Sequence, residues 1–234
     1  KICIFINLKL STKILSNSNT AFINFFNNPN NNLFKIIKNG IPYKSSKNYN
    51  KKDIYAKYKI PENSFLVGHI GRFVKQKNHE FIIRIAGNLL SDYENMFFLF
   101  CGKNVERNLK SNEVYKKYAS RFIFIDSVED IYELHQILSC FIFPSSFEGH
   151  PNVLLECINS KVPVLTSNID SIKEHLPKFM SSVLLDLHNE NSFTDKIIKY
   201  YNSEFDYNLE EASNWSRDEF DCNKCFEEFI VELI

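Results

Sequence analysis

The sequence predicts an α/β fold in which a doubly wound, Rossmann-like parallel sheet carries helices on both faces. From Ser64 onward, short apolar runs alternate with helix-length amphipathic stretches. The apolar runs are continuous, which is typical of strands that are covered on both faces. This strand–helix rhythm implies right-handed crossovers, and sheets of this kind bind ligands beyond the carboxyl ends of their strands.

The individual elements follow from these two patterns. Six apolar runs are predicted to be strands: Phe65–Ile70, Met96–Cys101, Phe122–Ile125, Cys140–Phe143, Val162–Thr166 and Val183–Leu187. Six stretches between or after them are predicted to be helices: Asn78–Leu90, Asn108–Ser120, Val128–Leu138, Asn152–Ser160, Ser171–Pro177 and Asn191–Ser203. In the first helix, Phe81, Ile85 and Leu89 recur at helical spacing.

The two ends of the chain fall outside this alternation. We divide the sequence into residues 1–43, 44–63, 64–217 and 218–234. The first segment contains candidate strands at Thr12–Leu15 and Phe34–Ile37. The second is polar and Lys-rich and is predicted to be a linker with a short helix. The third is the main domain, and the fourth has the amphipathic pattern of a helix.

The composition limits which partners the chain can have. The sequence is 44% hydrophobic and 24% charged, which is ordinary for a globular domain. Lys and Arg total 28, as do Asp and Glu, so no net charge draws the chain toward nucleic acid, and no nucleic-acid partner is predicted. No apolar run approaches the roughly 18 residues that a membrane-spanning helix needs.

Cysteine usage indicates a reducing compartment and no metal site. Most of the six cysteines lie inside apolar stretches, where a reduced thiol packs as a small hydrophobic group. Cys222 and Cys225 form a lone C-x-x-C without the second ligand pair of a zinc site, so we interpret them as unrelated thiols. We expect a cytoplasmic protein. Because the chain opens on Lys1 without a signal-peptide pattern, we also expect it to be a piece of a longer protein.

The loop after the first strand has the composition of an anion-binding site. Only six glycines occur in the chain, yet Gly68 and Gly71 both fall here, and Gly71 lets the backbone approach a ligand. Arg72 and Lys77 flank the start of a helix, whose N–H groups also favour anions. A guanidinium beside an ammonium makes a plausible diphosphate clamp. The alternative is a solvated cationic loop, and this loop alone does not decide between the two.

A second loop follows the fourth apolar run and also opens a helix. Pro151 suits the first helical position, and the N–H groups of Asn152 and Val153 are then expected to be free to bind an anion. Glu148 lies before the helix and Glu156 two turns inside it. Carboxylates at the carboxyl end of a strand accept hydrogen bonds from sugar or ribose hydroxyls. The alternative is that Glu148 caps the helix and Glu156 is a surface residue.

A third loop, Asp126–Asp130, ends another strand, and the sequence leaves its role open. It suits a helix N-cap with acids that favour the helix dipole, and it equally suits the wall of a base pocket. Several other nucleotide and hydrolase signatures are absent. The chain has no G-x-G-x-x-G, no P-loop, no Asp-x-Asp and no G-x-S-x-G.

Taken together, these residues resemble the C-terminal domain of the family 4 (group 1) glycosyltransferases, which have the GT-B fold. The resemblance is carried by Gly71-Arg72, Lys77-Asn78, Pro144-Ser145, Glu148-Gly149-His150-Pro151 and Glu156. The E-G-x-P-x-x-x-x-E pattern beside G-R-x-x-x-x-K is fairly specific. Asn39-Gly40-Ile41 resembles the turn that ends the family's N-terminal domain, and residues 14–26 resemble the strand and helix before it. Within the family, the chain looks most like capsule and exopolysaccharide enzymes.

The resemblance implies the C-terminal half of a GT-B fold. Residues 1–43 would be the remnant of the N-terminal acceptor domain, and residues 218–234 the helix that crosses back onto it. It implies a retaining hexosyltransferase without metal or cofactor, which moves a sugar from a UDP- or GDP-linked donor to a glycan or lipid-linked acceptor in polysaccharide biosynthesis. It also implies peripheral association with the inner face of the membrane, through the N-terminal domain.

Site roles are carried over by position. Arg72 and Lys77 would hold the donor's diphosphate, and Glu148 would lie by the transferred sugar; these three are the predicted catalytic residues. Glu156 would bind the ribose, and Ser127 and Val128 would lie near the base. The other predicted donor-binding residues, which would meet phosphate or sugar, are Gly71, Gly149, His150, Pro151, Asn152 and Val153.

Two departures from the family and two alternatives remain. The family's second glutamate is usually followed by Ala, whereas Cys157 stands here. By the same resemblance, the chain would lack most of the N-terminal domain, so we expect it to bind a donor but not to transfer its sugar alone. The same residues would suit a non-catalytic nucleotide-sugar-binding module, or an epimerase or phosphorylase on the same fold. The presence of all four side chains with assigned roles favours the transferase.

Overall fold

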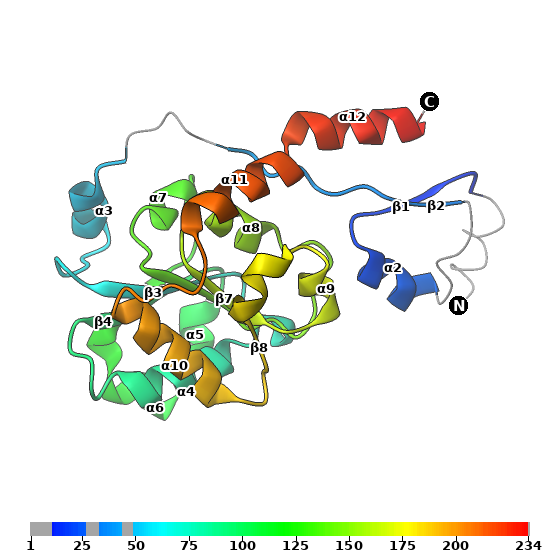
Figure 1. Ribbon diagram of the computed structural model, residues 1–234. Helices are drawn as coiled ribbons and strands as arrows, with labels where there is room; N and C mark the ends of the chain where they lie inside the picture. The colour runs from blue at the N-terminus through cyan, green and yellow to red at the C-terminus, as the bar shows by residue number, and fades with distance from the viewer. Residues whose placement is uncertain (1–10, 27–32, 44–48, 234) are drawn as a thin grey trace.

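Two parallel sheets organise the chain in the computed structural model, which describes residues 11–26, 33–43 and 49–233. The small sheet pairs β1 (Ile14–Ser16) with β2 (Phe34–Ile36), and α2 (Asn19–Phe26) lies between them in sequence. The large sheet has six strands in the order β5-β4-β3-β6-β7-β8 (Figure 1).

All six strands of the large sheet are parallel: β3 (Phe65–Ile70), β4 (Met96–Cys101), β5 (Phe122–Ile125), β6 (Cys140–Phe143), β7 (Val164–Ser167) and β8 (Leu184–Leu185). The helices are α3 (Lys51–Lys57), α4 (His79–Leu89), α5 (Val105–Leu109), α6 (Glu113–Lys117), α7 (Tyr132–His135), α8 (Asn152–Asn159), α9 (Asp170–Lys173), α10 (Glu190–Tyr201), α11 (Leu209–Glu219) and α12 (Cys222–Leu233). Three short 3₁₀ turns are η1 (Lys75–Lys77), η2 (Ala119–Arg121) and η3 (Lys178–Val183).

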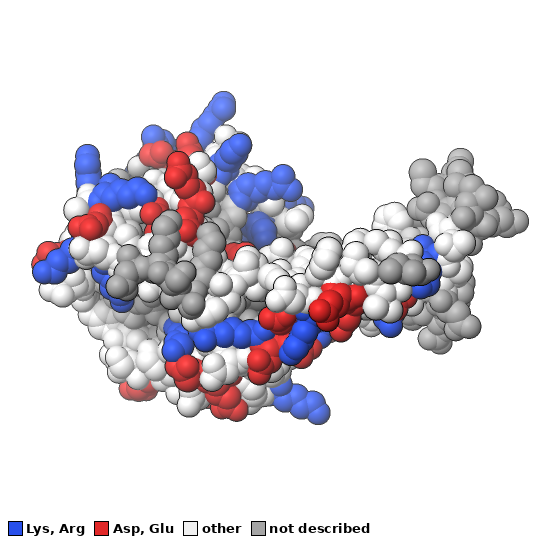
Figure 2. Space-filling view, turned by 90° about the horizontal axis from the view of Figure 1, so that it is seen from above, with Lys and Arg blue, Asp and Glu red and all other residues white. Residues whose placement is uncertain are grey.

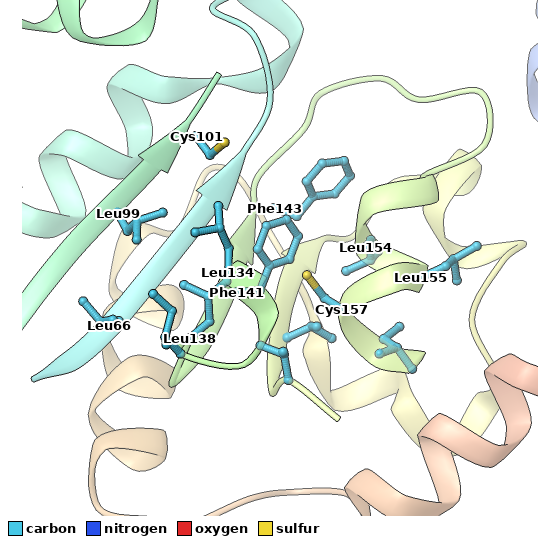
Figure 3. Close-up of a cluster of buried hydrophobic side chains, with 14 of the residues drawn as sticks. Leu66, Leu99, Cys101, Leu134, Leu138, Phe141, Phe143, Leu154, Leu155 and Cys157 are labelled. Carbon is cyan, nitrogen blue, oxygen red and sulfur yellow. The ribbon is translucent and has the colours of Figure 1, made fainter. Parts of the chain in front are cut away.

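The continuous apolar strands are explained by two cores, one on each face of the large sheet. Successive strand residues point to opposite faces, so Leu99 packs into one core and Phe98 into the other. One core lies beneath α7, α8 and α11, and the other beneath α4, α5 and α10 (Figure 1). In the first core, Phe141 and Phe143 of β6 lie between β3 and α8, beside Cys157 (Figure 3).

Most of the predicted elements are confirmed, and the exceptions have local causes. The first four predicted strands coincide with β3 to β6. The single helix predicted over Asn108–Ser120 is wrong, because the Asn112 side chain accepts a hydrogen bond from the Val114 N–H and starts a new helix, α6. The helix predicted over Val128–Leu138 is reduced to α7. The C-terminal helix begins only at Cys222, where the Asp221 carboxylate caps it.

The N-terminal segment is tied to the main domain by a carboxylate. Glu174, which directly follows α9, accepts hydrogen bonds from the Ser18 hydroxyl (2.5 Å) and from the Asn19 and Thr20 N–H groups. These N–H groups open α2, where the helix dipole favours a negative charge. Glu174 therefore caps a helix that lies more than 150 residues away in the sequence.

The last helix, α12, lies along the small sheet (Figure 1). Glu232 near its end pairs with Lys13 (3.0 Å), which just precedes β1, and with Lys35 (3.1 Å) of β2. At its start, the Ile41 N–H donates to the Phe220 carbonyl oxygen (2.8 Å). The C-terminal helix thus contacts the small sheet, and its role as a crossover onto an N-terminal domain stays a prediction.

Gly40 is expected to be required for this packing. A Cβ atom there would lie 2.6 Å from the Cα atom of Cys222, so Gly40→Ala must displace the start of α12. We expect the substitution to lower the free energy of unfolding by about 1–3 kcal/mol, measured by urea denaturation. Gly149→Ala is the control, because its Cβ would lie 3.6 Å from its nearest neighbour, Asn17. Equal stability of both variants would contradict the close approach.

The surface agrees with the balanced composition. Figure 2 shows Lys and Arg side chains interspersed with Asp and Glu over the face seen from above. Among the described residues, no helix is long and apolar enough to cross a membrane.

Candidate functional site

The centre of the large sheet is a topological switch point. β3 and β6 are neighbours there; the sheet grows from β3 through β4 to β5, and from β6 through β7 to β8. The loops after two such neighbouring strands run in opposite directions and leave a crevice between them. Ligands of these sheets bind in this crevice, beyond the carboxyl ends of the strands. The two loops singled out in the sequence follow Ile70 of β3 and Phe143 of β6, so they flank this crevice.

The loop after β3 continues the sheet before it turns back toward α4. The Gly71 N–H donates to the Cys101 carbonyl oxygen (2.8 Å), and the Phe73 N–H donates to that of Lys103 (3.1 Å). Arg72 is exposed and has no ion pair among the described residues. A Cβ on Gly71 would lie 3.5 Å from Lys77 Cδ, an ordinary contact, so the role of this glycine toward a ligand stays a prediction.

Lys77 and Glu148 are brought together across the crevice. Their side chains form an ion pair of 2.8 Å and are only 16% and 10% exposed. The Lys77 ammonium also lies 4.4 Å from the Phe143 ring centroid, and the Ser146 N–H joins the two loops by donating to the Gln76 carbonyl oxygen (2.8 Å). Glu148 does not cap α8. Two of the three predicted catalytic residues therefore meet, as a desolvated pair of opposite charges.

The predicted start of α8 at Asn152 is confirmed, but Pro151 stands just before the helix and not at its first position. The helix begins at Asn152, and Pro151 precedes it with φ −82° and ψ 62°. The Asn152 N–H donates to the His150 carbonyl oxygen (2.9 Å), so the prediction that it is free is wrong: the turn at Pro151 brings that carbonyl within reach. The Val153 N–H has no hydrogen-bond partner among the described residues and suits an anion.

Two buried histidines support the loop that carries Glu148. Nδ1 of His150 lies 2.7 Å from the Asn152 Oδ1 atom, which also accepts from the Asn39 side chain (3.1 Å). Nε2 of His175 lies 3.2 Å from the Gly149 carbonyl oxygen. Burial, with the neighbouring His175, lowers the pKa of His150 to about 4, and burial also lowers that of His175. Both rings are therefore neutral at neutral pH and act as hydrogen-bonding supports.

Glu156 lies in a pocket of about 470 Å³ at the carboxyl ends of β3, β4 and β5, which we name the β3–β5 pocket. Its lining consists of Pro42, Ile70, Gly71, Arg72, Cys101, Gly102, Ser127, Val128, Glu129, Asp130, Ile131, Tyr132 and Glu156. Burial raises the pKa of Glu156, as expected for a carboxyl group that is partly removed from water. The alternative of a plain surface residue is therefore wrong.

The third loop lines the pocket and also contacts the start of α7, and its role toward a base stays a prediction. Ser127 and Val128 line the β3–β5 pocket, whereas Asp130 accepts hydrogen bonds from the Tyr132 N–H (3.2 Å) and the Tyr49 hydroxyl (2.8 Å). Sequence reasoning missed Cys101, the last residue of β4, and Gly102, which follows it, although both lie at the carboxyl end of a strand, where the general rule places ligands. Within the part of the chain that the structure describes, no group of three or more His, Cys, Asp or Glu side chains is placed to hold a metal ion.

Comparison with known proteins places the chain in a family. The model of the glycosyl transferases group 1 matches residues 50–218. The chain belongs to this family. It is 24% identical over 168 residues to the capsular polysaccharide biosynthesis glycosyltransferase CapM of Staphylococcus aureus, an alignment that covers 71% of this chain and 44% of CapM.

A second curated relative and a solved structure are also similar to this chain. An Escherichia coli relative named UDP-Gal:alpha-D-GlcNAc-diphosphoundecaprenol alpha-1,3-galactosyltransferase is 25% identical over 172 residues, which cover 70% of this chain and 44% of the relative. The crystal structure of Anabaena HepE in complex with UDP-glucose matches 99% of this chain and 66% of HepE, with a TM-score of 0.85 at 16% identity. The predicted family, the GT-B fold and the likeness to capsule enzymes are confirmed. The chain spans less than half the length of these two curated relatives.

Proposed function

We propose that this group 1 glycosyltransferase chain binds a nucleotide-diphosphate sugar and that its protein transfers the sugar, with retention, to a glycan or lipid-linked acceptor. The observation that carries the proposal is the arrangement around one crevice: Lys77 and Glu148 face each other, and Arg72 and Glu156 line the adjoining pocket. This set offers two cations for a diphosphate, one carboxylate for a sugar and one for a ribose.

Each group has a proposed role in the transfer. Ser127 and Val128 receive the base, and Glu156 accepts hydrogen bonds from the ribose hydroxyls. Arg72, Lys77 and the Val153 N–H bind the diphosphate. As the bond between the sugar's anomeric carbon and the diphosphate oxygen breaks, negative charge grows on the departing nucleotide, and fixed cations stabilise it. Lys77 must then leave Glu148, at least in part, which frees that carboxylate for the transferred sugar.

The relatives support a particular donor and acceptor. HepE was solved with UDP-glucose, and the E. coli relative carries UDP-galactose and a diphosphoundecaprenol acceptor in its name. We therefore favour a UDP-linked donor and a lipid-linked acceptor, with the reaction at the cytoplasmic face of a membrane. Residues 11–26 and 33–43 contact the donor side through hydrogen bonds from Asn19 to Glu174 and from Asn39 to Asn152, and they are proposed to be the end of the acceptor-binding half.

Calorimetric titration of the chain with UDP, GDP and ADP, in EDTA, tests the donor site. We expect one nucleoside diphosphate to bind, at least tenfold more tightly than the other two and with no need for a metal. The matching nucleotide sugar should compete for the same site. Failure of all three diphosphates to bind would contradict the proposal for this chain, and equal weak binding of all three would indicate a site for phosphate alone.

A further inference from the structure

A buried histidine contacts the peptide bond between Gly71 and Arg72, two residues that line the β3–β5 pocket. Nε2 of His79, the first residue of α4, lies 3.2 Å from the Gly71 carbonyl oxygen. His79 is 2% exposed, and its burial lowers the ring's pKa to about 4. The ring is therefore neutral at neutral pH and carries one N–H. Because a carbonyl oxygen only accepts, that proton lies on Nε2.

The ring of His79 is itself fixed in place. His69 on β3 meets it edge-on, with 4.7 Å between the ring centroids, and Phe73 lies against it at 5.1 Å. Nδ1 of His69 lies 2.9 Å from the Ile142 carbonyl oxygen on β6. The two histidines thus connect the backbone of β6, through β3, to the first peptide of the donor loop.

A glycine packs against the same peptide. A Cβ atom on Gly102 would lie 2.1 Å from the Gly71 carbonyl oxygen and 2.5 Å from its carbonyl carbon. Only a residue without a side chain leaves the peptide where it is. The Gly71–Arg72 peptide is therefore held by the close packing of Gly102 as well as by the hydrogen bond from His79.

The fixed carbonyl determines where the adjoining N–H points. No peptide bond among the described residues is cis, so the Arg72 N–H points away from the carbonyl that His79 holds. This N–H has no hydrogen-bond partner among the described residues, and Gly71, Arg72 and Gly102 all line the β3–β5 pocket. A backbone N–H that is held rigid at a pocket wall is an effective donor to an anion, because it needs no reorganisation on binding.

We propose that His79 is a positioning residue, which holds the Gly71–Arg72 peptide so that the Arg72 N–H donates to a phosphate oxygen of the donor. The proposal rests on the proposed function, since it adds a backbone contact to the same diphosphate site. It assigns the Arg72 position two contributions, one from its guanidinium and one from its main chain. The second remains when the side chain is removed.

Two substitutions of His79 separate this role from plain packing. His79→Phe keeps an aromatic ring of similar size against His69 and Phe73 but has no donor. His79→Gln keeps an N–H donor close to the place of Nε2. For whichever of UDP, GDP and ADP binds the wild-type chain, we expect His79→Phe to weaken binding about tenfold, as for the loss of one hydrogen bond to a charged group. The matching nucleoside should bind as before, and His79→Gln should restore most of the diphosphate affinity.

Other results would overturn the proposal. Equal affinity of the Phe variant and the wild type, equal loss in the Gln and Phe variants, or equal loss for nucleoside and diphosphate would each do so, while leaving the proposed function intact. If the wild-type chain binds none of the three diphosphates, the proposed function and this inference fall together. If the Phe variant does not fold, nitrogen-15 resonances of wild-type His79 decide: a proton on Nε2 supports the proposal, and a proton on Nδ1 overturns it.

Discussion

Lys77→Ala is expected to weaken binding of the nucleoside diphosphate about a hundredfold, while the matching nucleoside binds as before. The ammonium is only partly exposed and lies between the two donor loops, where few water molecules can replace it. Removing one partner from a desolvated charge contact costs roughly 2–5 kcal/mol, and about 2.7 kcal/mol corresponds to two decades in affinity. Calorimetry with the diphosphate and its nucleoside on the same variant gives both numbers.

The substitution has a second expected consequence, in the absence of ligand. Glu148, which is only 10% exposed in the wild-type chain, loses its partner, so the variant should unfold more easily, by about 3 kcal/mol. Titrations must therefore be made well below the variant's melting temperature. Glu148→Gln together with Lys77→Ala should recover part of this stability, because the double variant leaves no buried charge unpaired, but it should not recover diphosphate binding.

Arg72→Ala and Lys75→Ala test whether the other cations of the same loop also contribute to diphosphate binding. Arg72 lines the β3–β5 pocket, so its removal should also weaken the diphosphate more than the nucleoside, with little effect on stability since the side chain is exposed. Lys75 follows Arg72 in the same loop but lies outside the pocket, so it serves as the control, with wild-type binding expected. If Lys75→Ala reduces binding as much as Arg72→Ala, the loop acts through its overall charge and the specific clamp is wrong.

The sequence predicted the large sheet well because its strands are buried on both faces. A continuous apolar run as short as Met96–Cys101 is typical of a strand in the middle of such a sheet, and its bounds agree with β4. The helices were harder to predict from the sequence where polar capping contacts, and not the hydrophobic periodicity, set their ends. α11 was missed because Leu209–Glu219 is polar over most of its surface; Asn208, which caps it by accepting from the Glu210 and Glu211 N–H groups, was the available signal.

The site was predicted as a set of residues but not as a set of contacts. Local sequence places Lys77 and Glu148 on two different loops, and only the adjacency of β3 and β6 makes them partners. The roles of His79 and His175 toward backbone carbonyls depend in the same way on tertiary packing. Motif reasoning names the groups that are proposed to face a ligand, whereas the groups that hold them in place leave little pattern in one sequence.

Glu156→Gln is expected to make the chain more stable at neutral pH and a poorer binder of ribonucleotides. Burial raises the pKa of the Glu156 carboxyl in the folded state. Its contribution to stability is therefore full below the unfolded-state pKa of about 4.3 and is lost as pH rises through the raised folded pKa. At neutral pH the ionised, partly buried carboxylate destabilises the folded state. An uncharged amide of the same shape does not have this cost. The gain in melting temperature should fade as the pH falls below about 4.

The same substitution, which should raise stability, should lower the affinity for ribonucleotides. A carboxylate accepts hydrogen bonds from two ribose hydroxyls more strongly than an amide does, so Glu156→Gln should weaken the ribonucleoside diphosphate about tenfold. Its 2′,3′-dideoxy analogue has no hydroxyls to donate and should bind both proteins equally; a matching loss for the analogue would remove the ribose role. A stabilising substitution that selectively loses ribose recognition would mean that Glu156 is kept ionised at the pocket wall for its ligand, at a cost to the fold that only the ligand's hydroxyls offset.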